Sequence, residues 1–458
     1  MRDLPFLVLS LSCLVSVPAQ PRPSEPASAA DALEASVDAA VELAEWGAQH
    51  GFAAEAGALI RRVQRVQPGH HSASLLRKIA EAACDEDEDT AQMLRRRHAV
   101  EHATQLAGLR AALTHALAAG TTDQGNESLV AVATLDPDLP GIGDKLRRQG
   151  FDMLGGYGPL TASVLQAARA DLSELGGGLP SALDLSAVRA QWPDAFGVRT
   201  AHFAVYTNVD LPLAIEVARH VEAVHAVWEK LAAEAGLAVT AAGKLLEVRM
   251  FDARATFDAL IDDRVLRVAC ARETDTVGVY SFRARLACSY LAGDRAADRR
   301  RLIENIGHET VHQLFHLRVR GRAALPVETI AFSWIEEAVC LYSETLDVGA
   351  GTALGARCDD DLARGVACAQ TDHDPLARVR RVCSGLFLDA GDYGCAALLA
   401  SCLMEAPDQA WRAAFLSALR GDLDQAESGQ QLLRRLGDET AFRAHFEAHA
   451  QMVGKRCK

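Results

Sequence analysis

The spacing of the apolar residues changes along the chain and predicts several kinds of region. Residues 31–150 show only the three-to-four-residue spacing of helices, and residues 151–194 predict a linker with some helix around the run Gly176–Gly178. Residues 195–350 mix helical and strand-like spacing, and residues 351–458 return to amphipathic helices. We therefore expect an α+β chain that is mainly α, with a small mixed sheet between helical N- and C-terminal regions.

The mixed region contains the strongest local signals. Four short stretches favour strands, and the last two predict a hairpin: 202–209, 245–251, 277–282 and 286–291. Asp210 is placed to cap a helix with one apolar stripe, and a long helix is expected over residues 296–317.

The helical region 31–150 contains one stretch with the spacing of a tetratricopeptide repeat, and a looser second one ends at residues 135–137. The residues that carry the first match are Leu43, Ala44, Ala56, Ile60, Val63 and Pro68. Two such units are fewer than stack stably alone. A repeat array that binds a protein partner and a generic helical hairpin both remain open.

The first residues predict export. Arg2 precedes an apolar stretch of secretory length, and small residues at 17–19 suit cleavage, which gives a signal peptide over 1–19 and a linker over 20–30. The stretch is too short to span a bilayer, and a lipoprotein site at Cys13 would leave fewer than about ten apolar residues before it. We expect a periplasmic or extracellular protein with no transmembrane segment after cleavage.

Charge and cysteine content narrow the function. The 47 basic and 61 acidic residues give a net charge of −14, which disfavours nucleic-acid binding. Seven of the 11 cysteines fall between residues 340 and 457, which suggests disulfides in an exported chain. The sequence does not fix the pairing, and Cys358 with Cys368, and Cys383 with Cys395 or Cys402, are guesses.

The predicted long helix contains the pattern H-E-x-x-H from His308 to His312. Residues four apart lie on one helix face, so His308 and His312 can hold one zinc ion, while Glu309 lies beside that face and can act as general base on water. Gly307 would let a neighbouring strand approach closely. A catalytic zinc also needs a third protein ligand.

The third ligand is expected outside this helix. Phe315 and Arg318 occupy the Gly and His positions of a metzincin, which excludes that class, and His316 is interpreted as a supporting or surface residue. A following apolar helix is interrupted by Glu336 and Glu337, and buried acids need a partner. This order of elements is that of a gluzincin, in which the third ligand is a glutamate.

Residues 195–450 resemble the peptidase MA-like gluzincins, in particular an uncharacterised family common in planctomycete-type bacteria. The shared positions are His308, Glu309, His312, Gln313, Leu314, Trp334, Ile335, Glu337 and Tyr342. The resemblance implies that Glu337, and not Glu336, is the third zinc ligand. Glu336 is turned about 100° away from Glu337 on a helix, so Glu336→Ala should be tolerated. Ala338 and Cys340 replace the usual Gly and Ala, and Cys340 is open to zinc ligation, to a disulfide or to burial as a small apolar residue.

A second pattern, H-x-x-E-H, runs from His98 to His102 and is typical of inverted zinc peptidases. Three arginines, Arg95–Arg97, precede it and disfavour a cation, so we interpret this segment as a solvated helix face.

The sequence thus predicts an exported zinc metallopeptidase that acts on a peptide or protein substrate, with Glu309 as general base. An edge strand of the predicted hairpin would pair with the substrate. Tyr280, Tyr342 and His373 are candidates for stabilising the oxyanion. The alternative is a scaffold or binding protein whose zinc site is inactive or structural.

Overall fold

The computed structural model describes residues 29–68, 70, 88–119, 125–154, 157–240, 243–260, 278–293, 296–324, 333–348, 354–355, 357–423 and 431–457. The predicted signal peptide and nearly all of its linker lie outside these residues. None of the helices in the described ranges is long and apolar enough to cross a membrane.

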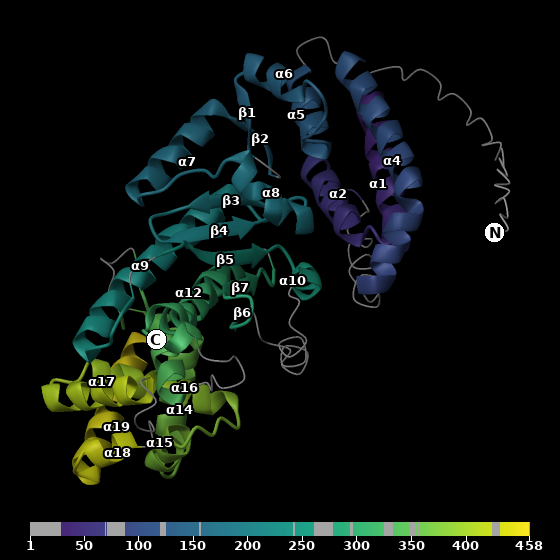
Figure 1. Cartoon of the computed structure of the whole chain (residues 1–458). Coiled ribbons are helices and arrows are strands. Elements are labelled where there is room, and N and C mark those ends of the chain that lie inside the picture. Colours follow the sequence, from purple (N-terminus) through teal and green to yellow (C-terminus); the bar gives the residue numbers. More distant parts are fainter. Residues whose placement is uncertain are drawn as a thin grey trace, which may run out of the picture.

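The N-terminal region is helical, as predicted. Its elements are α1 (Ala29–Gln49), α2 (Ala53–Val66), α4 (Glu88–Ala119), α5 (Gly125–Leu135) and α6 (Ile142–Arg148). Helix α1 packs against α2 and α4, and these three helices lie at the end of the molecule away from the C-terminal helices (Figure 1). Ala44, Ala56 and Ile60 from the predicted helix pair are buried in this contact because small residues allow close approach.

Residues 151–194 contain more structure than predicted. A hairpin of β1 (Phe151–Leu154) and β2 (Gly158–Thr161) precedes α7 (Ala162–Glu174) and α8 (Ala182–Gln191). The glycine run is not a free linker, because Gly178 exchanges two backbone hydrogen bonds with Arg199, of 3.0 and 2.8 Å. A side chain at Gly177 would overlap the backbone of Arg199, so the run fastens α7 to the sheet.

A five-stranded mixed sheet forms the centre of the molecule. Its strands, in spatial order, are β3 (Phe196–Arg199), β4 (Phe203–Thr207), β5 (Leu246–Phe251), β7 (Leu286–Tyr290) and β6 (Gly278–Ser281). The pairs β4–β5 and β5–β7 are parallel, whereas β3–β4 and β6–β7 are antiparallel. The four predicted strands and the predicted hairpin are therefore present, β3 is an addition, and β6 is an edge strand.

Helices cover both faces of this sheet (Figure 1). Helices α9 (Leu211–Ala235) and α12 (Ala296–Arg318) pack on the face that carries Val205 and Val248. Helices α8 and α10 (Arg254–Leu260) pack on the face that carries Tyr206 and Tyr290. Asp210 caps α9 as predicted, because its side chain accepts a hydrogen bond of 2.8 Å from the Leu213 amide.

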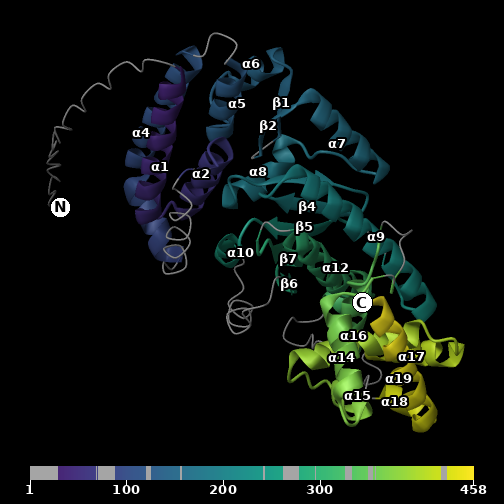
Figure 2. The ribbon, with the colours of Figure 1, turned by 180° about the vertical axis from the view of Figure 1, so that it is seen from behind.

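The C-terminal region is a group of helices continuous with the core of the sheet (Figure 2). The elements are η1 (Arg322–Ala324), α13 (Trp334–Ser343), α14 (Asp360–Thr371), α15 (Pro375–Cys383), α16 (Ala390–Met404), α17 (Gln409–Leu423), α18 (Leu432–Arg435) and α19 (Glu439–Arg456). The chain is therefore α+β and mainly α, as the apolar spacing predicts.

The guessed cysteine pairs are wrong. Cys358, just before α14, forms a disulfide with Cys457, just after α19, with a Cα–Cα distance of 5.2 Å. The reason is that α14 and α19 pack together, which sequence spacing does not reveal. The other guessed partners are free thiols on helices of this group: Cys368, Cys383, Cys395 and Cys402.

Candidate metal centre

Helix α12 carries the H-E-x-x-H residues at the centre of the molecule, where the helix is enclosed on several sides. It packs against α9, α13, β6 and β7, so apolar residues hold its other faces in place. His308, Glu309 and His312 are buried, and the rings of the two histidines lie 5.0 Å apart. The predicted helical spacing therefore does bring the two imidazoles to one place.

Helix α13 brings Glu337 to the same place. Ser333 caps this helix through the Ile335 amide, and the helix packs against α12. The Glu337 carboxylate lies between the two rings, with Oε1 at 3.5 Å from Nε2 of His308 and Oε2 at 3.1 Å from Nε2 of His312. Glu337 therefore contacts both predicted histidine ligands, although the donor atoms that all lie within 4.8 Å of one another are those of His308, His312 and Cys340.

The other ring nitrogens of both histidines face carboxylates. Nδ1 of His308 lies 2.8 Å from Oε1 of Glu344, and Nδ1 of His312 lies 3.3 Å from Oε1 of Glu336. Arg322 donates to the second oxygen of Glu336 at 2.8 Å. A histidine that donates its Nδ1–H to a carboxylate presents its Nε2 lone pair to a metal, so these contacts orient both rings.

Glu336 makes contacts of its own in the site. Its helical position, turned away from Glu337, predicts that Glu336 is dispensable, but its side chain is 1% exposed and contacts both His312 and Arg322. The two neighbouring acids of α13 act on different atoms of the same imidazole, because Glu337 faces Nε2 and Glu336 faces Nδ1. Removing Glu336 leaves the Arg322 guanidinium buried without this partner, which is costly.

The acids of the site differ in their electrostatics. Burial raises the pKa of Glu337, but the two neighbouring histidines outweigh this effect and bring its pKa below the usual value. For Glu309 burial prevails, with Glu337 and Glu344 adding to it, and its pKa is raised although the histidines oppose this. The carboxylate of Glu337 is thus favoured as an anion, whereas Glu309 has increased affinity for a proton.

Cys340 lies one helical turn after Glu336 and Glu337 and is also part of this cluster. Its Sγ lies within 4.8 Å of ring nitrogens of both His308 and His312. The thiol is fully buried and is not in a disulfide, which excludes one of the three options for it. Burial raises the pKa of the thiol to about 12, so the site favours its protonated form in the absence of a metal.

His316 and Tyr280 form a buried pair next to the centre. The Tyr280 hydroxyl is hydrogen-bonded to Nδ1 of His316 at 2.7 Å, and burial lowers the pKa of His316 to about 4. His316 is therefore a supporting residue and not a surface one. Of the other oxyanion candidates, Tyr342 donates to Glu405 at 3.3 Å, and His373 is exposed between α14 and α15.

Gly307 does allow a close approach, but to a helix. An added Cβ would lie 2.6 Å from Nε2 of His220 on α9, so the predicted neighbouring strand is wrong. Sequence reasoning also missed Glu344 and Arg322. Glu344 follows the end of α13 and Arg322 belongs to η1, so neither has a regular spacing from H-E-x-x-H that signals its role.

The second pattern, on α4, forms an aromatic cluster. His102 stacks on Phe52 with ring centroids 4.1 Å apart, and His98 packs edge-on against His50 at 4.5 Å. His98 also lies 3.3 Å from Glu101. Within the described residues, neither histidine belongs to a group of three ligand atoms close enough to share a metal. The interpretation as a non-metal helix face remains, although the rings are packed and not simply solvated.

Comparison with known proteins adds no identification. No protein-family model matches the chain, and no curated protein matches it significantly.

Proposed function

We propose that this chain is a zinc-dependent metallopeptidase of the gluzincin type. The observation that carries the proposal is the meeting of His308, His312 and Glu337, whose donor atoms converge while carboxylates hold the opposite nitrogens of both rings. Two imidazoles and one carboxylate are a donor set of catalytic zinc sites, in which a fourth position stays open.

The residues of this centre suit a zinc ion, and each would have a different role. His308, His312 and Glu337 would hold the metal, which when bound supplies a Lewis acid that polarises a carbonyl and acidifies water. Glu309 would accept a proton from the attacking water and later deliver it to the leaving amine. The pKa of Glu309 is raised by burial, which is the direction that favours holding this proton.

The sheet offers a surface on which a substrate can extend. Within the described ranges, strand β6 lies at the edge of the sheet, pairs with β7 alone and packs against α12. An extended peptide can add to such an edge through main-chain hydrogen bonds, which holds the scissile bond without selecting its sequence. We propose this strand as the substrate-binding edge.

Export is part of the proposal. The Cys358–Cys457 disulfide agrees with an oxidising compartment, because cytosolic thiols are usually kept reduced. Recovery of mature protein that begins near Gln20 from a periplasmic or extracellular fraction would support export, and intact Met1 in cytosolic protein would contradict it.

The test of the activity is cleavage of a denatured-protein pool, read by mass spectrometry. The zinc-loaded protein should produce new peptide termini, chelation should stop this, and added zinc should restore it. His308→Ala should abolish both zinc binding and cleavage, because two remaining ligands hold zinc poorly. Cleavage that survives complete zinc removal contradicts the proposal.

Cys340 favours a second candidate function, a structural zinc site in a binding protein. If Cys340 joined the two histidines and Glu337, four protein ligands would close the coordination sphere and leave no position for water. Cys340→Ala separates the candidates. If the site is catalytic, Cys340→Ala should keep both zinc and activity. If the site is structural, Cys340→Ala should lower zinc affinity by orders of magnitude, and the wild-type protein should already show no activity.

A further inference from the structure

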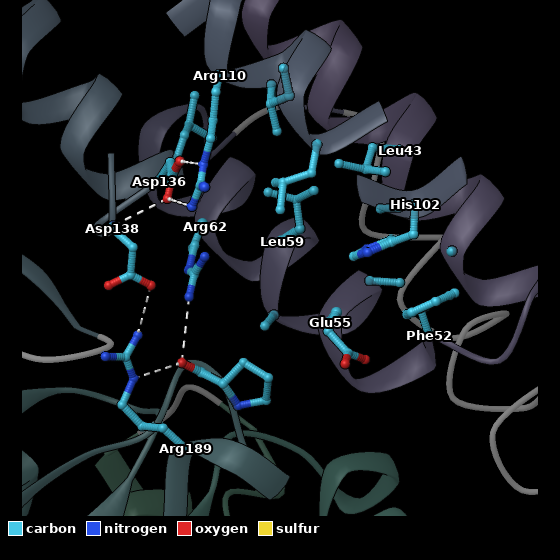
Figure 3. A pocket seen from close by; sticks show the side chains of 18 of the residues that line it. Leu43, Phe52, Glu55, Leu59, Arg62, His102, Arg110, Asp136, Asp138 and Arg189 are labelled. Carbon is cyan, nitrogen blue, oxygen red and sulfur yellow. Dashed lines mark hydrogen bonds and ion pairs between the residues drawn. The ribbon is translucent and has the colours of Figure 1, made fainter. Parts of the chain in front are cut away.

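A cavity of about 420 Å³ lies between the N-terminal helices α1, α2, α4 and α5 and the end of α8 (Figure 3). Its volume is within the range of small-molecule binding sites, roughly 300–1,000 Å³. One part of the wall is apolar, with Leu43, Phe52 and Leu59, and another is charged, with Arg62 and Asp136. None of these residues belongs to the metal centre.

Helix α2 turns three arginines toward the rest of the molecule, and two of them are anchored. Arg61 makes two hydrogen bonds to the buried carboxylate of Asp194, of 2.5 and 3.0 Å. Arg65 donates to the backbone oxygens of Tyr157 and Asn208, at 2.9 and 2.8 Å. These contacts hold α2 against the sheet region and occupy both guanidinium groups.

Arg62 lies between these two residues in the sequence and does not have two such hydrogen bonds among the described residues. Among the described residues, Arg62 donates a hydrogen bond to the Pro193 oxygen at 3.5 Å, and its buried Nε has no hydrogen-bond partner. Burial lowers the pKa of Arg62 even though acidic side chains lie nearby. A buried guanidinium with an N–H that lacks a partner is stabilised by an anion that supplies hydrogen-bond acceptors.

The other cations of the cavity wall already have acidic partners. Arg110 donates to Asp136 at 2.7 Å, and Arg189 lies 3.5 Å from Asp138 (Figure 3). The two acids are thus engaged by other arginines, which leaves Arg62 as the group of this wall with the greatest need of an acceptor.

An acid of opposite sign, Glu55, lines the same cavity, and its charge acts on the neighbouring His102. Oε2 of Glu55 is buried and has no hydrogen-bond partner in the described part of the chain. Glu55 precedes Arg62 by seven residues on α2, which corresponds to about 10 Å along the helix axis. Leu59 lies between them, one turn from each, so the two charged groups are separated by apolar surface.

We propose that this cavity binds a short zwitterionic peptide with an apolar centre. The peptide carboxylate would bind Arg62, its ammonium group Glu55, and its side chains the surface of Leu59 and Phe52. An extended chain covers about 3.3–3.6 Å per residue, so a span of about 10 Å corresponds to about three residues. The site is separate from the metal centre, and the inference stands or falls independently of peptidase activity.

Calorimetric titration of the full chain with Leu-Ala-Leu tests the proposal, in a Glu309→Gln background so that the peptide is not consumed. We expect one peptide per chain. Amidating the peptide C-terminus or acetylating its N-terminus should each weaken binding by about 10- to 100-fold, because each removes one charged hydrogen-bond partner. These peptide changes test the contacts without altering the fold.

Two variants assign the contacts. The Arg62→Gln variant should bind the free peptide and the C-terminally amidated peptide with equal affinity. The Glu55→Gln variant should bind the free peptide and the N-terminally acetylated peptide with equal affinity. Arg148→Gln, a matched change of an exposed arginine on α6, should leave all affinities unchanged. Circular dichroism establishes that each variant is folded.

Several results would overturn the inference. Absence of binding at millimolar peptide, or binding that ignores both end groups, excludes a zwitterion site. Octanoate that binds as tightly as the peptide identifies a site for apolar acids instead. Binding lost in His308→Ala and retained in Arg62→Gln places the peptide at the metal centre.

Discussion

We expect Glu336→Ala to lower both the stability of the protein and its affinity for zinc. The Glu336 carboxylate is 1% exposed, lies 3.3 Å from Nδ1 of His312 and receives a 2.8 Å hydrogen bond from Arg322. Removing one partner of a buried ion pair typically costs about 3–5 kcal/mol, because the other charge stays buried. Loss of the carboxylate behind a metal-binding histidine typically lowers metal affinity about 10- to 100-fold.

Two measurements separate these effects. Urea denaturation of the metal-free protein gives the free energy of unfolding, and competition with a chelator gives zinc affinity. We expect Glu336→Ala to lower both. In the double variant Glu336→Leu, Arg322→Met no charge is left unpaired, so stability should largely return while zinc affinity stays low. Zinc affinity within twofold of wild type in both variants would refute the role of Glu336 in orienting His312.

Three further results are expected. Replacing Cys358 and Cys457 by serine should lower the free energy of unfolding by about 4–5 kcal/mol, measured by urea denaturation without reductant, because the bond closes a separation of 99 residues; an unchanged midpoint would contradict the pairing. His98→Ala and His102→Ala should leave the zinc content measured by elemental analysis unaltered, and a loss would move the metal site to α4. Burial lowers the pKa of His220 to about 4. The unfolded chain therefore binds the extra proton first, and stability should fall as the pH drops from about 6.5 to 4, by about 3 kcal/mol. His220→Leu should flatten that part of the profile of unfolding free energy against pH, and an unchanged slope would exclude His220 as its source.

The sequence predicts those features whose apolar spacing repeats within one helix or strand. The four predicted strands, the stripe on α9 and the helix that carries His308 and His312 follow from periods of two or about four residues. Glu337 required more, because it lies on another helix and only the resemblance singled it out from Glu336. The structure brings it to the two histidines but also brings Glu336 there.

The remaining features depend on contacts between distant segments. Arg322 and Glu344 reach the site from beyond the ends of regular elements, and Cys457 meets Cys358 because α14 and α19 pack together. The hairpin β1–β2 has strands of four residues, and Gly158 and Pro159 weaken its alternation. No spacing rule in the sequence encodes these contacts.

The most direct test of the central claim compares wild-type protein with Glu309→Gln at equal zinc content. The side chain of glutamine has the size of glutamate but cannot accept the proton from water. We expect about one zinc per chain in both proteins and cleavage of the denatured-protein pool by the wild type alone. A Glu309→Gln protein that cleaves this pool at the wild-type rate would contradict the proposed mechanism, whatever its metal content.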